Sequence, residues 1–535
     1  MKRYKYIAAL LIGSLIGFSG CTDNFESDNE IKGAFNDEVK EYDYQKYTMP
    51  LEIIQSGIYF QYNWGDGINW PWQITQALQH DMFSGYFHDQ VSKFNDKNSV
   101  YKINTGWTNA AWNYTYKYIF PVAHSSELNS EGVEQAIHYY GLTQILKVEL
   151  MHRISDTYGP VVYSKFGNGE VNSVDTQQEA YAAFFSDLDK GIDAMDKYLK
   201  NGGDDLSLNA NDMLNAKSIK GWIKFANSLR LRLAMRISNV DKTNAEIQAK
   251  KALANPYGVL EAANEIIQVS GHGYTNPLIA IGGWGEAYMG ANMASLPTSY
   301  EDTRREKWYN KATLKGYENE WLGIPQGVFM QEGDPNYYGG YSALNTAGGE
   351  TTPAILMTAA EVWFLRAEAA LRGFSNETPK TCYETGIKTS FAQWGVGDAT
   401  NYLASDKKPS DYKEMVPASG GKDMKALITI SPKWNDTAGK EGQLEQIITQ
   451  KWLACWPESY EAWSEQRRTG YPKLFKVQTN NSGGTIDTND MIRRLPFSTD
   501  DADKDPVQYD LLKKALGGPD HGGTRLWWDA GKNNF

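Results

Sequence analysis

Apolar residues recur at intervals of three and four along several segments of the chain, which is the spacing of one buried face of an α-helix. In Ala136–Ser155, for example, Leu146, Leu150 and Ile154 share a face. The segments predicted to be helical are Leu51–Tyr62, Gln73–Phe83, Trp107–His124, Ala136–Ser155, Ala180–Leu199, Ile219–Ile237, Thr358–Arg372, Thr381–Trp394 and two helices within Lys451–Leu474. This pattern predicts a mostly α fold.

The stretch Lys451–Leu474 shows how the helices are expected to pair. Pro457 suits the first turn of a second helix, where a missing N–H costs nothing, and Gly470 followed by Pro472 is a typical helix end. Two antiparallel helices with a short joint form one unit of a helical repeat, and such a unit cannot bury its apolar face alone. We therefore expect several hairpins that resemble tetratricopeptide units.

Long irregular stretches separate the predicted hairpins. Residues 261–350 and 478–535 are rich in Gly, Asn, Asp and aromatic residues, and insertions of this length usually carry function or small elements of their own. No charge block or Pro/Ser-rich linker divides the chain. We expect one domain over residues 46–535, with the helical scaffold within about residues 50–240 and 355–475 and the loop-rich insertions on one side.

The first residues predict an export signal rather than part of the fold. Lys2, Arg3 and Lys5 precede a short apolar run that ends Phe18-Ser19-Gly20-Cys21. This ending resembles a bacterial lipobox, which would make residues 1–20 a signal peptide and Cys21 the acylated residue. Residues 21–45 are acidic and polar, so they predict a flexible tether. Acyl chains on Cys21 would anchor the protein durably to membrane lipid.

Composition narrows the possible partners. The apolar share of 41% is typical of globular proteins, and a mean hydropathy of -0.54 excludes a protein with many membrane spans. A formal net charge of -12 disfavours nucleic acid as a partner. Aromatic residues reach 13%, with 17 Trp and 33 Tyr. Most of these rings must lie in the core, but some could line a site for a ligand with flat apolar faces, such as a sugar.

The sequence contains none of the common catalytic or metal-binding signatures. HExxH, GxSxG and GxxxxGK[ST] are missing, so no catalytic residue, cofactor or metal is predicted. His80-Asp81 and His88-Asp89 are adjacent residues, whose side chains diverge on a helix. Asp501, Asp503 and Asp505 have the spacing of the first ligands of a calcium loop. Pro506 and Leu512 stand where an EF-hand needs Gly and Glu, so an EF-hand is excluded. A looser calcium site is the alternative that stays open.

Other reactive side chains have simpler interpretations. Glu458, Glu461 and Glu465 lie at helical spacing beside Arg467 and Arg468, which predicts ion pairs rather than acid–base catalysis. The arginines of Ile219–Ile237 are expected to pair with acids across a helix interface or to extend toward solvent. After lipidation of Cys21, two cysteines remain in apolar helical patterns, Cys382 and Cys455, and buried free thiols are favoured over a disulfide.

Ligand-binding residues are expected where aromatic rings lie among polar neighbours in loops, because a ring can stack on a sugar face while Asn, Asp or Gln bonds its hydroxyls. An equally good alternative is that these rings cover the helical core. The first candidate group is Trp64, Asp66, Asn69, Trp70 and Trp72; the second is Trp284, Glu286, Tyr288 and Asn292; the third and weakest is Asp334, Asn336, Tyr337, Tyr338 and Tyr341.

Several sequence segments together resemble those of the SusD/RagB family of outer-membrane lipoproteins. They are Cys21, Gln76–Phe87 (QALQHDMFSGYF), Asp156–Tyr163 (DTYGPVVY), Trp222–Arg236 (WIKFANSLRLRLAMR), Asp302–Arg305, Glu361–Ala370 (EVWFLRAEAA), Lys451–Pro472, Arg493–Pro496 and Arg525–Asp529. The resemblance covers nearly the whole mature chain. It implies a SusD-like fold with four tetratricopeptide-like hairpins, exposure on the cell surface and a SusC-like TonB-dependent transporter as partner.

Three functions follow as hypotheses. The first is a non-catalytic lipoprotein that captures oligosaccharides and delivers them to the transporter. The second is the same architecture capturing peptides. The third is a surface glycoside hydrolase, which needs two carboxylates roughly 5–10 Å apart on either side of the scissile bond.

Overall fold

The computed structural model describes residues 45–59, 70–89, 94, 98–167, 173–331, 333–531 and 533–535. Within them the chain is mostly helical, as the periodicity predicts. The α-helices are α4 (Gln45–Ile58), α5 (Trp70–Trp72), α6 (His80–Phe83), α7 (Thr105–Tyr114), α8 (Phe120–Ser130), α9 (Ile137–Tyr158), α10 (Gln177–Lys200), α11 (Ile219–Arg236), α12 (Lys242–Leu253), α13 (Pro277–Gly283), α14 (Ala291–Ser299), α15 (Arg305–Trp308), α16 (Ala359–Arg372), α17 (Pro379–Trp394), α18 (Thr400–Leu403), α19 (Gly439–Cys455), α20 (Ser459–Thr469), α21 (Thr499–Lys504) and α22 (Pro506–Leu516).

Shorter elements complete the described part of the chain. Two π-helical turns are η2 (Gln73–Ala77) and η4 (Thr115–Ile119), and the 3-10 turns are η3 (Asn98–Val100), η5 (Glu134–Ala136), η6 (Asn209–Asn211) and η7 (Pro417–Ser419). The strands are β1 (Phe87–His88), β2 (Ile266–Val269), β3 (Tyr288–Met289) and β4 (Ala354–Thr358). Both strand pairs, β1 with β3 and β2 with β4, are antiparallel and link an insertion to the scaffold.

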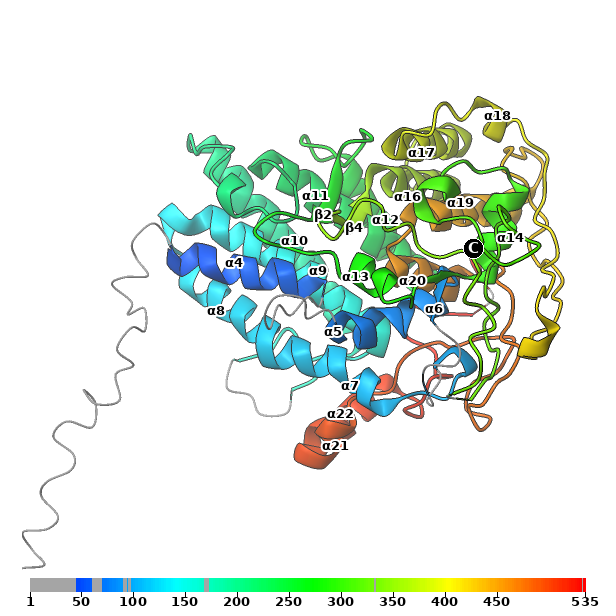
Figure 1. Cartoon of the computed structure of the whole chain (residues 1–535). Coiled ribbons are helices and arrows are strands. Elements are labelled where there is room, and N and C mark those ends of the chain that lie inside the picture. The colour runs from blue at the N-terminus through cyan, green and yellow to red at the C-terminus, as the bar shows by residue number, and fades with distance from the viewer. Residues whose placement is uncertain are drawn as a thin grey trace, which may run out of the picture. The chain divides into compact units, whose positions relative to one another are not determined.

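The helices pack in a continuous series. Helix α9 lies between α8 and α10, α10 packs on α11, and α11 reaches α16. Helix α16 in turn contacts α17 and α19, and α20 packs against both α19 and α9. Figure 1 shows α9 beside α10, and α16 beside α17 and α19. Helix α11 thus joins the N-terminal helices to the C-terminal ones, so segments far apart in sequence share one core.

Local signals explain most of the observed helix ends. Thr358 caps α16 by accepting a hydrogen bond from the Glu361 N–H, and Gly373, with φ +83°, ends that helix in the left-handed conformation. Gly470 ends α20 in the same way, as its place in the sequence predicts. The prediction for Pro457 is wrong: α20 begins at Ser459, because Pro457 lies in the turn after α19 and Glu458 occupies the cap position.

Other boundaries also differ from the prediction. Helix α4 begins at Gln45 rather than near Leu51. The predicted helix Gln73–Phe83 is divided, because Leu78 and Gln79 leave helical geometry between η2 and α6. Helix α12 has no counterpart in the prediction, since only Ala245, Ala249 and Ala252 form its buried stripe and alanine is a weak apolar signal.

The core contains buried ion pairs as well as apolar side chains. Arg232 binds Glu361 through two hydrogen bonds of 2.8 Å, and Arg236 contacts Asp156 at 3.2 Å and both Glu461 and Glu465. Their side chains are almost fully buried. The arginines of α11 therefore pair with acids across helix interfaces, which is one of the two predicted alternatives.

Two further cations complete this ion-pair network. Lys451 lies 2.6 Å from Glu461, and Arg468 lies 2.6 Å from both Glu368 and Glu465. Burial by itself raises the pKa of Glu461, but the nearby Arg236 and Lys451 outweigh it and lower that pKa to about 2. The glutamates of α20 are thus held ionised as structural partners.

Replacing Arg236 by Ala should therefore destabilise the protein strongly. The substitution leaves buried carboxylates without their cation, which typically costs about 3–5 kcal/mol. Chemical denaturation of the purified protein measures the effect. The matched control is Lys250→Ala, because Lys250 forms an exposed pair with Glu246 and its loss should change stability by less than about 1 kcal/mol. Equal effects of the two substitutions would contradict a structural role for the network.

Candidate functional site

The structure describes only part of the first candidate group, because its description resumes at Trp70. Trp64, Asp66 and Asn69 lie outside the described residues. Trp70 and Trp72 belong to α5, and their side chains have opposite environments. Trp70 is 46% exposed, whereas Trp72 is fully buried, with its ring stacked on Tyr59 at a centroid distance of 5.9 Å. Of the two tryptophans of this group that the structure describes, Trp70 offers its ring to solvent.

The second candidate group lies at the end of α13. Trp284 caps the C-terminus of this helix and is 44% exposed. Glu286, two residues later, is buried and accepts a hydrogen bond from the side-chain amide of Gln73 in η2. Helix α13 also packs on η2. Each exposed tryptophan therefore lies close in sequence to one partner of the hydrogen bond between Gln73 and Glu286. Trp70 lies three residues before Gln73, and Trp284 lies two residues before Glu286.

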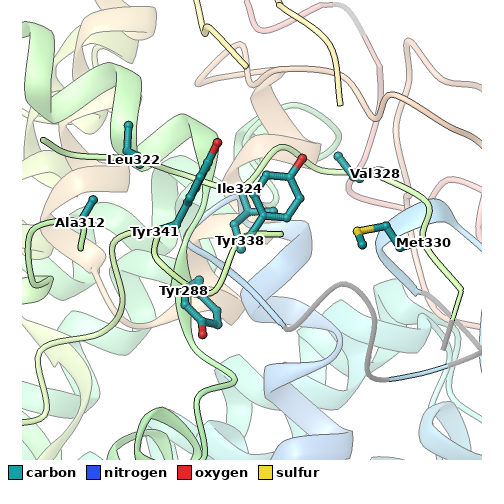
Figure 2. Close-up of a cluster of buried hydrophobic side chains, with 8 residues drawn as sticks. All are labelled: Tyr288, Ala312, Leu322, Ile324, Val328, Met330, Tyr338 and Tyr341. Atoms are coloured by element: carbon teal, nitrogen blue, oxygen red, sulfur yellow. The ribbon is translucent and has the colours of Figure 1, made fainter. Parts of the chain in front are cut away.

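The remaining members of this group support the surrounding backbone. Tyr288 lies in β3 opposite His88 of β1, and its ring belongs to a buried apolar cluster with Ile324 and Tyr338 (Figure 2). The Asn292 side-chain oxygen accepts a hydrogen bond of 2.8 Å from the Phe475 backbone N–H. Both side chains are more than nine-tenths buried. Both side chains hold segments together and are closed to solvent.

The tyrosines of the third candidate group pack against the protein, whereas its polar members Asp334 and Asn336 are exposed. Tyr338 and Tyr341 are buried in the apolar cluster of Figure 2. Tyr337 is partly buried and packs against this cluster. The hydroxyls of Tyr338, Tyr341 and Tyr412 all donate to the carboxylate of Glu414, at 3.0, 3.2 and 3.0 Å. Burial raises the pKa of Tyr338. We call this arrangement the Glu414 anchor; it joins two loop segments that are distant in sequence.

The side chains considered for catalysis have structural partners. Glu458 lies 3.0 Å from Arg153, and Glu461 and Glu465 belong to the buried ion-pair network, as their spacing predicts. His80 stacks on Tyr460 with ring centroids 3.6 Å apart, while Asp81 accepts a hydrogen bond of 2.5 Å from Ser459. No group of three or more His, Cys, Asp or Glu among the described residues is arranged to hold a metal.

The two described cysteines are buried free thiols, as the apolar pattern around them favours. Burial raises the pKa of the Cys382 thiol to about 12 and that of Cys455 well above its usual value. A thiol that stays protonated is a poor nucleophile, so neither residue is suited to covalent chemistry. In the described part of the chain, no helix has the length and apolar character needed to cross a membrane.

Comparison with known proteins decides the family. The model described as "SusD-like: Susd and RagB outer membrane lipoprotein" matches residues 27–529. The chain belongs to the SusD/RagB family. No curated protein matches the sequence.

Solved structures of SusD homologues share the fold of this family member. One from Bacteroides vulgatus is 64% identical, with a TM-score of 0.91, and the match covers 93% of this chain and 100% of that one. A chitin-binding SusD homologue from Flavobacterium johnsoniae is 34% identical, with a TM-score of 0.85 and coverages of 91% and 100%. A homologue from Bacteroides uniformis is 32% identical, with a TM-score of 0.82 and coverages of 91% and 99%. The mostly α, SusD-like fold is thereby confirmed.

The different environments of the candidate residues predict different effects on stability. Tyr338→Ala removes a buried ring and two hydrogen bonds, so it should lower the free energy of unfolding by about 3–5 kcal/mol. Trp284→Ala removes a half-exposed ring and should change it by less than about 1 kcal/mol. Thermal and chemical denaturation of both variants measure the difference. A large loss of stability in Trp284→Ala would instead assign that ring a structural role.

Proposed function

We propose that this SusD/RagB family member is a cell-surface lipoprotein that captures oligosaccharides and passes them, without catalysis, to a SusC-like TonB-dependent transporter. The observation that carries the proposal is the pair of exposed tryptophans, Trp70 and Trp284, on elements joined by the hydrogen bond between Gln73 and Glu286. Exposed apolar patches rimmed by polar residues commonly mark ligand-binding surfaces. Among the described candidates, these two rings are available for such contacts.

The chemistry of this surface suits a saccharide. A sugar ring has an apolar face that can lie on an indole, and a rim of hydroxyls that can bond to amide and carboxylate groups. Buried Glu286, with its partner Gln73, ties down the chain two residues after Trp284, so the backbone that carries this indole is ordered before a ligand arrives. Trp72, Tyr288, Asn292, Tyr337 and Tyr338 act in this proposal as supports of the surface.

The first ligand to test comes from a relative. The homologue from Flavobacterium johnsoniae, 34% identical over 91% of this chain, is described as chitin-binding. Chitin is a polymer of N-acetylglucosamine, whose rings present the flat faces that tryptophans stack against. We therefore place oligosaccharides of N-acetylglucosamine first in a panel that also contains other neutral glycans and peptides.

The proposed location rests on the first residues of the chain. We propose that residues 1–20 are removed, that Cys21 is acylated and inserted in outer-membrane lipid, and that residues 21–45 act as a tether for one domain over residues 46–535. An acidic tether next to the anchor would keep that domain away from the membrane surface by charge repulsion and hydration.

Calorimetric titration against the panel tests the binding function. Trp70→Ala and Trp284→Ala should each weaken the binding of an oligosaccharide at least about tenfold, which corresponds to a loss of about 1.4 kcal/mol. The matched control is Phe535→Ala, which removes an exposed aromatic ring that lies near Arg372 of α16 and Lys440 of α19. It should leave the affinity unchanged.

Two results of the same titrations would count against the proposal. Binding of peptides in place of every glycan would favour peptide capture by the same fold. Release of reducing ends from a bound glycan would show catalysis and end the pure-binding interpretation. If a glycan binds but neither tryptophan substitution weakens it, the binding surface lies elsewhere.

Cys21→Ala tests the membrane anchor. Without the thiol that would receive the acyl chains, the protein should move from the outer-membrane fraction to the soluble fraction of lysed cells. Fractionation followed by immunoblotting measures this change, and Cys382→Ala is the control that removes a thiol without affecting the anchor. Retention of Cys21→Ala in the membrane fraction would refute acylation at this residue.

A further inference from the structure

A second candidate binding site is lined by residues other than those of the proposed glycan surface. A cavity of about 670 Å³ is lined by residues of α7, η4, α21 and α22. Its volume is within the range of ligand pockets in proteins, and its lining includes neither Trp70 nor Trp284. In Figure 1, α21 and α22 lie beside α7. Val162 and Phe166 also line the cavity, so three segments form it, and two of them are almost four hundred residues apart in the sequence.

One wall of the cavity is aromatic. Trp112 and Tyr116 are neighbours at a centroid distance of 4.7 Å, and Tyr114 and Tyr118 lie 6.3 Å apart. Trp112 is buried, whereas Tyr114 and Tyr118 are partly exposed on the cavity side. The backbone passes here from α7 into the π-helical turn η4. Because π-helical turns are rare and frequent at functional sites, this local geometry is an independent sign of a binding role.

The opposite wall carries carboxylates in fixed positions. Asp501 accepts a hydrogen bond of 2.7 Å from the indole N–H of Trp112, and Asp500 accepts one of 2.9 Å from the side-chain amide of Asn113. These bonds join α21 to α7. Since a carboxylate has about four acceptor positions, each aspartate can also accept hydrogen bonds from a ligand.

The charges around the cavity limit the class of ligand. Three aspartates, Asp500, Asp501 and Asp505, face two lysines, Lys117 and Lys504, so the lining has a formal charge of about −1. A site with this balance does not favour a polyanion. Stacking surfaces on one side and hydroxyl acceptors on the other match a neutral sugar chain.

We propose that this cavity is a second carbohydrate-binding site, in which a neutral oligosaccharide stacks on Tyr114 and Tyr118 and donates hydroxyl hydrogen bonds to Asp500 and Asp501. The proposal takes its ligand class from the proposed function and adds a second site to the surface that carries Trp70 and Trp284. Two separate sites would let the protein hold a polysaccharide at two places, which raises the apparent affinity for long chains over short ones.

Stoichiometry separates the two sites. The probe is a neutral tetrasaccharide from the glycan panel, the N-acetylglucosamine tetrasaccharide first, titrated calorimetrically into the full-length protein. Wild type should bind two molecules, and the double substitutions Trp70→Ala/Trp284→Ala and Tyr114→Ala/Tyr118→Ala should each leave one. Combining all four should abolish binding. Tyr114→Phe/Tyr118→Phe is the matched control, because it keeps both rings and should retain the second site.

Hydrogen exchange gives a readout that does not depend on substitutions. The tetrasaccharide should protect backbone amides of residues 112–118 and 500–508 in wild type and in the tryptophan double variant, but not in the tyrosine double variant. The second site would be overturned if the tryptophan double variant bound no tetrasaccharide and if adding the tetrasaccharide did not slow hydrogen exchange in these two segments. The proposed function would then remain intact. Failure of wild type to bind any glycan in the panel would overturn both.

Discussion

Arg236 holds three carboxylates from two distant parts of the chain in a space that water does not reach: Asp156 of α9 and Glu461 and Glu465 of α20. Asp156 also accepts hydrogen bonds from the Tyr181 hydroxyl and the Trp528 indole. Because any sliding of one helix would leave a buried charge without a partner, the network restricts the helices to one relative arrangement. Apolar contacts alone are less selective, since neighbouring registers bury similar areas.

This network is linked to the proposed glycan surface through short contacts. Helix α20 packs on α6, where the Ser459 hydroxyl donates a hydrogen bond to Asp81. The turn η2 precedes α6 and presents Gln73 to Glu286, next to Trp284. A rigid core thus extends through α6 and η2 to a surface ring.

Helical periodicity predicted the scaffold well, because long amphipathic segments carry their own signal in neighbouring residues. It could not distinguish Trp70 from Trp72, since the orientation of each indole depends on whether Tyr59 packs against it. The burial of Tyr338 depends on Glu414, which lies 76 residues away. The tyrosine-lined cavity also depends on a distant partner, because Asp501 is 389 residues from Trp112. Aromatic residues at alternate positions from Trp112 to Tyr118 were the available signal, but the sequence analysis treated this stretch only as part of the helix Trp107–His124.

The Glu414 anchor has a consequence for how binding preferences can change. Three phenol hydroxyls on one carboxylate, together with the adjacent apolar cluster, hold two loop segments together in the absence of a ligand. A ligand that meets ordered loops does not have to supply the free energy of ordering them. Outward-facing residues on these loops can therefore be exchanged during evolution without disturbing the anchor, so one scaffold can present a succession of different surfaces.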